Sequence, residues 1–148
     1  MKTVRNLLDH KGRHVSSISA ADTALEAAHR MNDQRIGSLV VTADGKVIGI
    51  ITERDILTRI VAVERDPSAT RVEEIMSHPV ACCRLDTTVE ECRSVMTVKR
   101  IRHLPVVEEG RLMGIITSGD ILASEIQEHK TTIEYLNEYL YSSGAPHG

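Results

Sequence analysis

The segment Gly49-Ile50-Ile51-Thr52-Glu53-Arg54-Asp55-Ile56-Leu57 decides the fold, because the chain contains it twice. The second copy, Gly114-Ile115-Ile116-Thr117-Ser118-Gly119-Asp120-Ile121-Leu122, begins 65 residues later, at position 114 instead of 49. The same offset aligns further pairs without a gap: Thr23/Thr88, Glu26/Glu91, Met31/Met96, Arg35/Arg100, Ile36/Ile101, Leu39/Leu104, Val41/Val106 and Gly45/Gly110. This unit is too long for an ankyrin or leucine-rich repeat, and two copies do not make a solenoid. The sequence therefore predicts a small module used twice and folded against itself.

Each copy of the motif has the pattern of a strand end followed by a helix start. We expect Thr52 and Thr117 to be N-caps, with Asp55 and Asp120 at the third helical position. Each repeat also has an earlier Thr-x-x-Glu box in which the longer Glu can reach back to the cap amide: Thr23 to Glu26 and Thr88 to Glu91. Because Asp is one atom shorter, we expect its carboxylate to accept hydrogen bonds from a ligand, and ribose hydroxyls are the obvious donors. The positive end of the helix dipole would also tolerate a nearby phosphate. The alternative is that both carboxylates are only helix caps.

Together with Ile101-Arg102-His103-Leu104-Pro105-Val106-Val107, the doubled motif resembles a tandem pair of CBS domains (a Bateman module). The resemblance covers about Val4 to Ile126 and is greatest to small stand-alone prokaryotic CBS-pair proteins. It implies an α+β fold with α/β-like repeats, in which two β-α-β-β-α units pack with pseudo-two-fold symmetry through their sheets. It also implies two clefts between the repeats, which in this family commonly bind adenosine-containing ligands. We expect repeat 1 at about 8–65, repeat 2 at about 73–127, and a C-terminal helix and disordered tail at 128–148.

Apolar periodicity and turn residues predict the elements of both repeats. In the first we expect a helical turn within 1–11 ended by Gly12, a strand at 15–18, a helix at 23–34, strands at 37–42 and 47–51 joined at Asp44-Gly45, and a helix from Thr52 to about 66. In the second we expect an opening turn at 72–76, a strand at 79–84, a helix at 88–99, strands at 104–107 and 111–116, and a helix from Thr117. The helix after Thr52 is expected to carry one apolar side: Ile56, Leu57, Ile60 and Val61.

The same patterns predict a core and a tail. Six strand residues are expected to be buried at a centre that both repeats share: Leu39, Val41, Ile50, Leu104, Val106 and Ile115. After Gln127 a further helix is expected, with one apolar stripe flanked by tyrosines: Ile133, Leu136, Leu140, Tyr135, Tyr139 and Tyr141. Residues 144–148 are expected to be disordered.

Composition excludes several classes of protein. The 148 residues carry a net charge of −3 and are 2% aromatic, without Trp or Phe, so we expect no nucleic-acid partner and no membrane partner. No apolar run approaches spanning length and the start of the chain lacks a signal-peptide pattern, so a soluble, cytoplasmic protein is expected. The three cysteines, Cys82, Cys83 and Cys92, fit a reducing compartment, and the vicinal pair is expected in a buried strand more than as a redox site.

No pattern of catalytic residues is present. The sequence lacks the Gly-x-Ser-x-Gly, Walker and dinucleotide-binding motifs. His10 and His14 have helical metal-ligand spacing, but Gly12 interrupts it and no acidic residue supports it. The other histidines outside the strands are scattered and expected in solvent: His29, His78, His129 and His147. We therefore expect no catalytic residues, no metal and no enzyme activity.

Basic residues mark a candidate phosphate site. Arg102 and His103 stand at a strand start where the first repeat has Gly37 and Ser38. In CBS proteins that this chain resembles, such residues face a cleft and bind ligand phosphates; Arg54 is expected to act similarly in the other cleft, and Gly119 replaces it in the second motif. If His103 met phosphate as imidazolium, affinity would fall between about pH 6 and 8. The alternative is that Arg102 and His103 are surface residues.

The resemblance also implies nucleoside contacts. Ser77, Pro79 and Cys82 are expected beside the nucleoside held by Asp55. By the repeat offset, Gly12 and Ser17 take the matching places in the Asp120 cleft. Gly37 and Ile18 are further expected contacts.

Two classes of function remain open. The first is a regulatory module that binds an adenine nucleotide, with AMP or ATP as the expected ligand and NAD or S-adenosylmethionine as alternatives, and acts on a separate partner protein. The second is a non-catalytic structural protein whose clefts are vestigial. A homodimer is expected in either case, because two-fold pairing is the commonest closed symmetry and the tail helix offers an apolar stripe.

Overall fold

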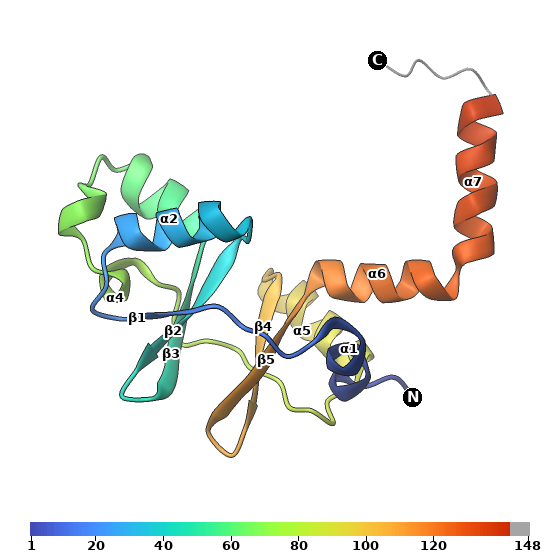
Figure 1. Cartoon of the computed structure of the whole chain (residues 1–148), viewed down its shortest axis with the longest axis horizontal. Helices are drawn as coiled ribbons and strands as arrows, with labels where there is room; N and C mark the ends of the chain where they lie inside the picture. The colour runs from blue at the N-terminus through green and yellow to red at the C-terminus, as the bar shows by residue number, and fades with distance from the viewer. Residues whose placement is uncertain (143–148) are drawn as a thin grey trace.

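The computed structural model describes residues 1–142, and the side chains of residues 131–133 and 141–142 lie outside that description. Figure 1 shows two similar α/β halves side by side and a helical arm at the C-terminal end. The first half and the connection contain α1 (Val4–Lys11), β1 (Ser17–Ser19), α2 (Ala24–Gln34), β2 (Ser38–Ala43), β3 (Lys46–Thr52), α3 (Glu53–Ile56), η1 (Leu57–Val61), η2 (Pro67–Ala69) and α4 (Val72–Ile75). The remainder contains α5 (Val89–Lys99), β4 (His103–Glu108), β5 (Arg111–Thr117), α6 (Ser118–Glu128) and α7 (Lys130–Ser142). The expected mixed fold of two repeated units is confirmed.

Each half is organised around a tight β-hairpin. In the first sheet β1 runs parallel to β2, and β2 is antiparallel to β3; in the second, β4 is antiparallel to β5. Both hairpin turns have two residues with positive φ, 52° and 75° at Asp44-Gly45 and 50° and 78° at Glu109-Gly110. Such turns match the right-handed twist of the strands. The Asp-Gly signal therefore located the first hairpin correctly.

The strand expected at 79–84 does not form, although the structure describes all of these residues. Within this segment Cys83 alone pairs with β4, through Cys83 N to Pro105 O at 2.9 Å and Val107 N to Cys83 O at 2.9 Å. Side-chain oxygens take the next amides, because Arg84 N donates to Thr87 Oγ1 and Leu85 N donates to Glu108 Oε1, each at 2.9 Å. These local bonds compete with the strand ladder, so the second sheet has two strands where the first has three.

Each half has its own apolar core, and the expectation of one shared centre is wrong. Leu39 and Val41 lie in the core of the first half, and Leu104 and Val106 in that of the second. Successive strand residues face opposite sides of a sheet, so the motif residues that fill these cores are Ile51 and Ile116, both 0% exposed. Ile50 is buried but belongs to neither core, and Ile115 is only half-buried.

The short opening helices are exchanged between the halves. Val4, Leu7 and Leu8 of α1 pack in the second core, whereas Val72, Ile75 and Met76 pack in the first. The motif glycines permit this packing. A Cβ at Gly49 would lie 2.6 Å from Met76 Sδ, and one at Gly114 would lie 2.9 Å from Leu8 Cδ2. The doubled Gly of the motif is therefore where the opening helix of the other repeat meets the strand.

The helices after the two motifs differ. In the second repeat α6 is a continuous α-helix, whereas in the first the single turn of α3 continues as the π-helix η1. Ile60 is buried but Leu57 and Val61 are exposed, and the matching Leu122 and Ile126 of α6 are exposed as well. Of the four residues expected on one apolar side, Ile56 and Ile60 pack against the first core, whereas Leu57 and Val61 face solvent.

The tail forms α7 as expected. Figure 1 shows this helix turning away from the body at the end of α6. Tyr135, Leu136, Tyr139 and Leu140 are all exposed. The side chains of Ile133 and Tyr141, and the tail at 144–148, lie outside the described residues. Within residues 1–142, no helix has the length and apolar character needed to cross a membrane.

Candidate functional site

The two Thr-x-x-Asp segments form complete capping boxes. Asp55 N donates to Thr52 Oγ1 at 3.3 Å while Thr52 N donates to Asp55 Oδ2 at 2.9 Å. The same reciprocal pair links Thr117 and Asp120, at 3.1 and 2.8 Å. Both α3 and α6 therefore begin at a threonine, as the sequence predicts.

The Thr-x-x-Glu boxes lack the expected hydrogen bond from the cap amide to the Glu side chain. Thr23 and Thr88 cap α2 and α5, but neither Glu26 nor Glu91 bonds back to the cap amide. Glu26 instead accepts from Arg30 Nε at 3.1 Å, and Glu91 accepts from the Thr88 hydroxyl at 3.1 Å. The shorter Asp side chain fits the return bond better here, so one oxygen of each Asp carboxylate is already committed to its helix.

The second oxygen of Asp55 faces the start of the second repeat. Asp55 Oδ1 accepts from Ser77 Oγ at 2.9 Å, and Arg59 Nε lies 3.9 Å away. Ser77 is held there because its backbone exchanges two hydrogen bonds with Ile50, at 2.8 and 3.1 Å. Asp55 is 4% exposed. A carboxylate oxygen has more than one lone pair, so Oδ1 can accept a further hydroxyl beside Ser77.

Asp120 has a different neighbour. Its Oδ2 atom accepts from Lys11 Nζ at 2.5 Å, and the same ammonium donates to Ile115 O at 2.9 Å. The constant offset of 65 placed Gly12 opposite Ser77, but Lys11 occupies that position in space. Gly12 ends α1 with φ of 100°, and a Cβ added there would meet no heavy atom within 4 Å apart from its neighbours in the chain.

A cavity of about 1130 Å³ opens between the halves beside Asp55. Its wall combines the first motif, the start of the second repeat and the start of β4, with these polar and charged residues: Thr52, Glu53, Arg54, Asp55, Ser77, Thr97, Arg100, Arg102, His103, Thr117 and Ser118. Arg54 was expected in a different cleft from Arg102 and His103, and this is wrong because all three line the same cavity. Asp120 does not line it.

The expected nucleoside contacts divide into two groups. Gly37, Ser77 and Pro79 line the cavity. Cys82 does not line it; this residue is exposed, with its thiol directed at Val80 O. Ile18 is 2% exposed in the core of the first half, and Ser17 is exposed on β1, where its carbonyl accepts from Arg30.

Sequence reasoning missed several lining residues, among them Glu53, Val80, Ala81 and Arg100. Arg100 ends α5 in the left-handed conformation, with φ of 55° and ψ of 46°, as Arg35 ends α2. The repeat alignment of Arg35 with Arg100 was visible in the sequence, but it did not indicate which arginine faces the cavity.

His103 is half-buried between several charged groups. Burial lowers the pKa of His103 from its ordinary value of 6.5, and the charges of Lys11 and Arg102 lower it further. Glu53 and Asp120 act in the opposite direction but have smaller effects. This lowered pKa favours the neutral imidazole near pH 7. The loss of affinity expected between about pH 6 and 8 stays a prediction.

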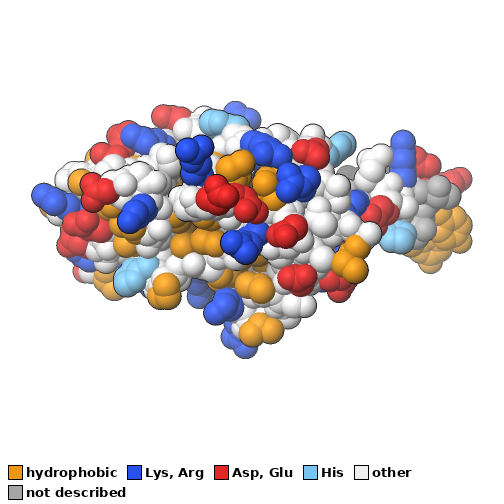
Figure 2. Space-filling view, turned by 90° about the horizontal axis from the view of Figure 1, so that it is seen from below, with side chains coloured by type: hydrophobic (Ala, Val, Ile, Leu, Met, Phe, Trp, Pro, Cys, Tyr) orange, Lys and Arg blue, Asp and Glu red, His pale blue; other side chains and the backbone are white. Residues whose placement is uncertain are grey.

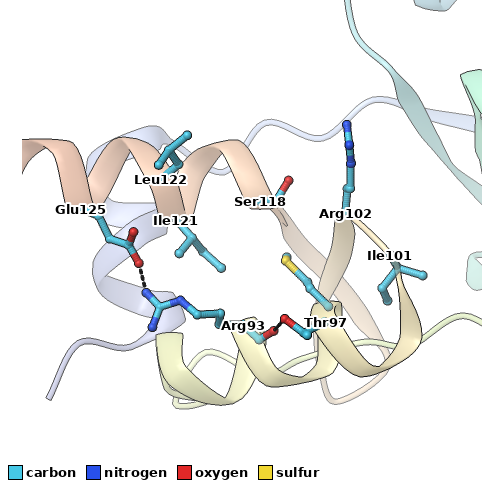
Figure 3. Close-up of a pocket in the computed structure, with 9 residues that line it drawn as sticks. Arg93, Thr97, Ile101, Arg102, Ser118, Ile121, Leu122 and Glu125 are labelled. Carbon is cyan, nitrogen blue, oxygen red and sulfur yellow. Dashed lines mark hydrogen bonds and ion pairs between the residues drawn. The ribbon is translucent and has the colours of Figure 1, made fainter.

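A smaller cavity of about 310 Å³ lies between α5 and α6. Figure 3 shows the ion pair of Arg93 and Glu125 at one end, and Arg102 pointing away from this pair. On the face shown in Figure 2, acidic and basic side chains are interspersed among exposed apolar ones, without a large field of one sign.

Neither the cysteines nor the histidines form a metal site in the part of the chain that the structure describes. Residues 1–142 contain no group of three His, Cys, Asp or Glu side chains that could hold a metal ion. His10 and His14 are both exposed. Cys83 and Cys92 are buried free thiols, whereas Cys82 was expected in a buried strand and is exposed.

Comparisons with known proteins agree on one family. The family model of the CBS domain matches residues 7–62 and again 72–126. A mitochondrial CBS domain-containing protein of Arabidopsis thaliana, CBSX3, is 30% identical over 147 residues, which cover 93% of this chain and 71% of that protein. Other curated relatives are longer, and the chain spans 59% of one and 18% of another.

Solved structures show the same similarity. A CBS-domain protein of Burkholderia ambifaria, assigned to signal transduction, has a TM-score of 0.81 at 37% identity, covering 85% of this chain and 95% of that one. A hexameric CBS-CP12 protein from bloom-forming cyanobacteria has a TM-score of 0.76 at 27% identity, covering 96% and 86%. With two matched domains, exchanged opening helices and a cavity between the halves, this chain belongs to the CBS-domain family as a tandem pair.

Proposed function

We propose that this CBS pair is a non-catalytic regulatory module that binds an adenine nucleotide in the cavity beside Asp55 and acts on a separate partner protein. One observation carries the proposal: a capped Asp carboxylate and several cationic side chains line a single cavity between the repeats. Its volume of about 1130 Å³ is sufficient for a nucleotide, since small-molecule pockets usually measure about 300–1,000 Å³.

The charges of the cavity suggest how the ligand lies. Asp55 Oδ1 would accept a ribose hydroxyl beside Ser77, with Thr52 at the same helix start. Arg54, Arg102 and His103 would surround the phosphate, and Arg100 adds a fourth basic side chain. Arginine can bind a phosphate through two parallel hydrogen bonds, which favours AMP or ATP over uncharged adenosine. Gly37, Pro79, Val80 and Ala81 leave room for the base.

The experiment is calorimetric titration with adenosine, AMP, ATP, NAD and S-adenosylmethionine. Asp55→Asn keeps the side-chain size but removes the charge, and should cost on the order of 1.5–3 kcal/mol per charge-assisted bond. That loss means at least roughly tenfold weaker binding of AMP. Arg102→Gln should weaken AMP and ATP much more than adenosine. If Asp55→Asn binds AMP as tightly as wild type, the ribose assignment is wrong.

A second function is favoured by the complete capping boxes. Because each Asp carboxylate already bonds its own helix, both motifs can serve structure alone, and the chain would then be an interaction protein with vestigial clefts. Wild type that binds none of the five ligands would favour this alternative.

We also propose a homodimer formed through the helices that follow the motifs. Leu57 and Val61 in the first repeat, and Leu122 and Ile126 at the matching positions of the second, are exposed. Closed two-fold pairing would bury both sets. Light scattering at tens of micromolar should give twice the chain mass, and Leu57→Glu with Leu122→Glu should give a monomer. A monomeric mass for wild type would contradict the proposal.

A further inference from the structure

Lys11 links the N-terminal helix to the second motif. It is the last residue of α1, and α1 packs on the second half of the molecule. Its ammonium donates to Asp120 Oδ2 at 2.5 Å and to Ile115 O at 2.9 Å. The two side chains of the ion pair are 28% and 22% exposed. The contact is therefore a partly buried, charge-assisted bond between segments far apart in the sequence.

In the first half, neutral groups of Ser77 make the matching hydrogen bonds. Ile50 precedes Ile115 by the repeat offset, and its carbonyl accepts from the backbone amide of Ser77 at 2.8 Å. The hydroxyl of Ser77 donates to Asp55 Oδ1 at 2.9 Å. Lys11 thus contacts the corresponding carbonyl and carboxylate with one ammonium. The Asp120 carboxylate has a directly hydrogen-bonded cation, whereas the cation nearest to Asp55, Arg59 Nε, lies 3.9 Å away.

The different lengths of the opening helices explain this replacement. Val4 corresponds to Val72 in the packing of the two cores, but α1 continues to Lys11 whereas α4 ends at Ile75. The extra helical turn places Lys11 beside the second motif. At the matching place beside the first motif, the helix has already ended and Ser77 lies there. The last turn of a helix also favours a cation, because it carries the negative end of the helix dipole.

We propose that Lys11 makes the two clefts unequal: its ammonium occupies the Asp120 carboxylate, so that the chain binds one nucleotide, in the Asp55 cavity. This inference rests on the proposed function. A ribose hydroxyl at Asp120 would have to compete with an ammonium, so that both partners of the existing bond are charged, whereas a hydroxyl bonded to a carboxylate has only one charged partner. At Asp55 the ribose hydroxyl meets the neutral hydroxyl of Ser77, and the nearest cation, Arg59 Nε, lies 3.9 Å from the same oxygen, beyond hydrogen-bond distance. The second motif also has Gly119 where the first has Arg54, which leaves it one cation poorer for a phosphate.

Calorimetric stoichiometry with AMP tests the inference. Wild type and Asp120→Asn should each bind one AMP per chain with similar affinity, and Asp55→Asn should lose at least tenfold in affinity. Lys11→Ser removes the ammonium from Asp120 and should raise the stoichiometry towards two. Two sites in wild type, loss of the site in Asp120→Asn, or one site in Lys11→Ser would overturn the inference.

A measurement without ligand separates this inference from the proposed function. Urea midpoints of Lys11→Met, Asp120→Asn and the double variant form a double-mutant cycle. Lys11→Met should lower the midpoint in wild type but have little further effect in Asp120→Asn. Lys2→Met is the matched control, because Lys2 also pairs with α6, through Glu128 at 2.7 Å, away from the motif. Its effect should be the same in both backgrounds.

The outcomes distinguish the two ideas. If wild type binds no adenosine compound but the cycle shows coupling, the proposed function fails and Lys11 still holds Asp120. If Lys11→Met lowers the midpoint equally in both backgrounds, the ammonium does not hold the carboxylate, and the inference fails whatever the ligand result.

Discussion

Replacement of Gly49 by Ala tests whether the doubled motif is set by the packing of the opposite opening helix. A methyl group at Gly49 would lie 2.6 Å from Met76 Sδ, 3.0 Å from Ser77 O and 3.1 Å from Met76 Cγ. Real Cβ contacts are almost never as short as the first of these, so the neighbours must move. Met76 is 9% exposed within the first core, and the Ser77 carbonyl is fixed by a bond from Ile50 N at 3.1 Å.

The expected cost follows from these contacts. Inserting an extra methyl group into a packed core typically costs about 1–3 kcal/mol. Weakening the Ile50–Ser77 bond adds about 0.5–1.5 kcal/mol, whereas Ala in place of Gly in a strand returns about 0.5–1 kcal/mol. We therefore expect Gly49→Ala to lower the free energy of unfolding by about 0.5–4 kcal/mol, with a central value of about 2 kcal/mol. The same shift of Ser77 moves its hydroxyl away from Asp55, so AMP binding should weaken as well.

Urea denaturation followed by circular dichroism measures this change. Gly119→Ala is the control, because the nearest atom to its Cβ would be Thr117 Oγ1 at 3.5 Å and the site is an exposed first turn of α6. Alanine is the better helix former, so this variant should be stabilised by up to about 1 kcal/mol. If Gly49→Ala unfolds within about 0.5 kcal/mol of wild type, the range usual for a surface substitution, the packing argument is refuted.

Two further predictions concern stability. Because the pKa of His103 is lowered in the folded protein, the unfolded chain binds a proton more readily, and stability should fall as the pH drops below 6.5. His103→Gln should remove this pH dependence, whereas exposed His10→Gln should not. A pH dependence unchanged in His103→Gln would show that His103 is not its cause. Three carboxyl groups also have lowered pKa values: Asp66, Glu74 and Glu128. They affect stability only below their ordinary pKa values of 3.8 and 4.5, so they do not contribute to the change expected just below pH 6.5. Leu8→Ala empties part of the second core although Leu8 lies in the first helix, and it should cost about 2–5 kcal/mol. Exposed Val98→Ala should change stability by about 0.5 kcal/mol or less. Equal effects in denaturation would show that α1 is not part of that core.

For the capping boxes, the predicted helix starts were correct, but the predicted side-chain hydrogen bonds were not. The spacing of Thr52 and Asp55 placed the helix start correctly, because an N-cap depends only on neighbours along the chain. The choice between Asp and Glu as the residue that bonds back was reversed. It depends on side-chain rotamers and on competing partners, such as Arg30 beside Glu26.

Much of the fold followed from local pattern. The Asp44-Gly45 turn, the helices after Thr23 and Thr88 and the hairpin strands each depend on backbone preferences within a few residues. The strand expected at 79–84 failed, because Arg84 and Leu85 give their amides to Thr87 and Glu108. Glu108 is distant in sequence, so pattern along the chain could not indicate that competition.

The sequence by itself determined the two-fold repeat, the helix starts, the hairpin turns and the family, because these depend on residue types at fixed spacing. Only the tertiary structure decided that α1 packs in the second core, that Arg54, Arg102 and His103 share one cavity, and that Lys11 reaches Asp120. A constant offset assigns equivalent positions, but α1 has 8 residues where α4 has 4, and this additional turn carries Lys11 into the place of a serine. Such contacts depend on the relative placement of segments about a hundred residues apart, which no local preference specifies.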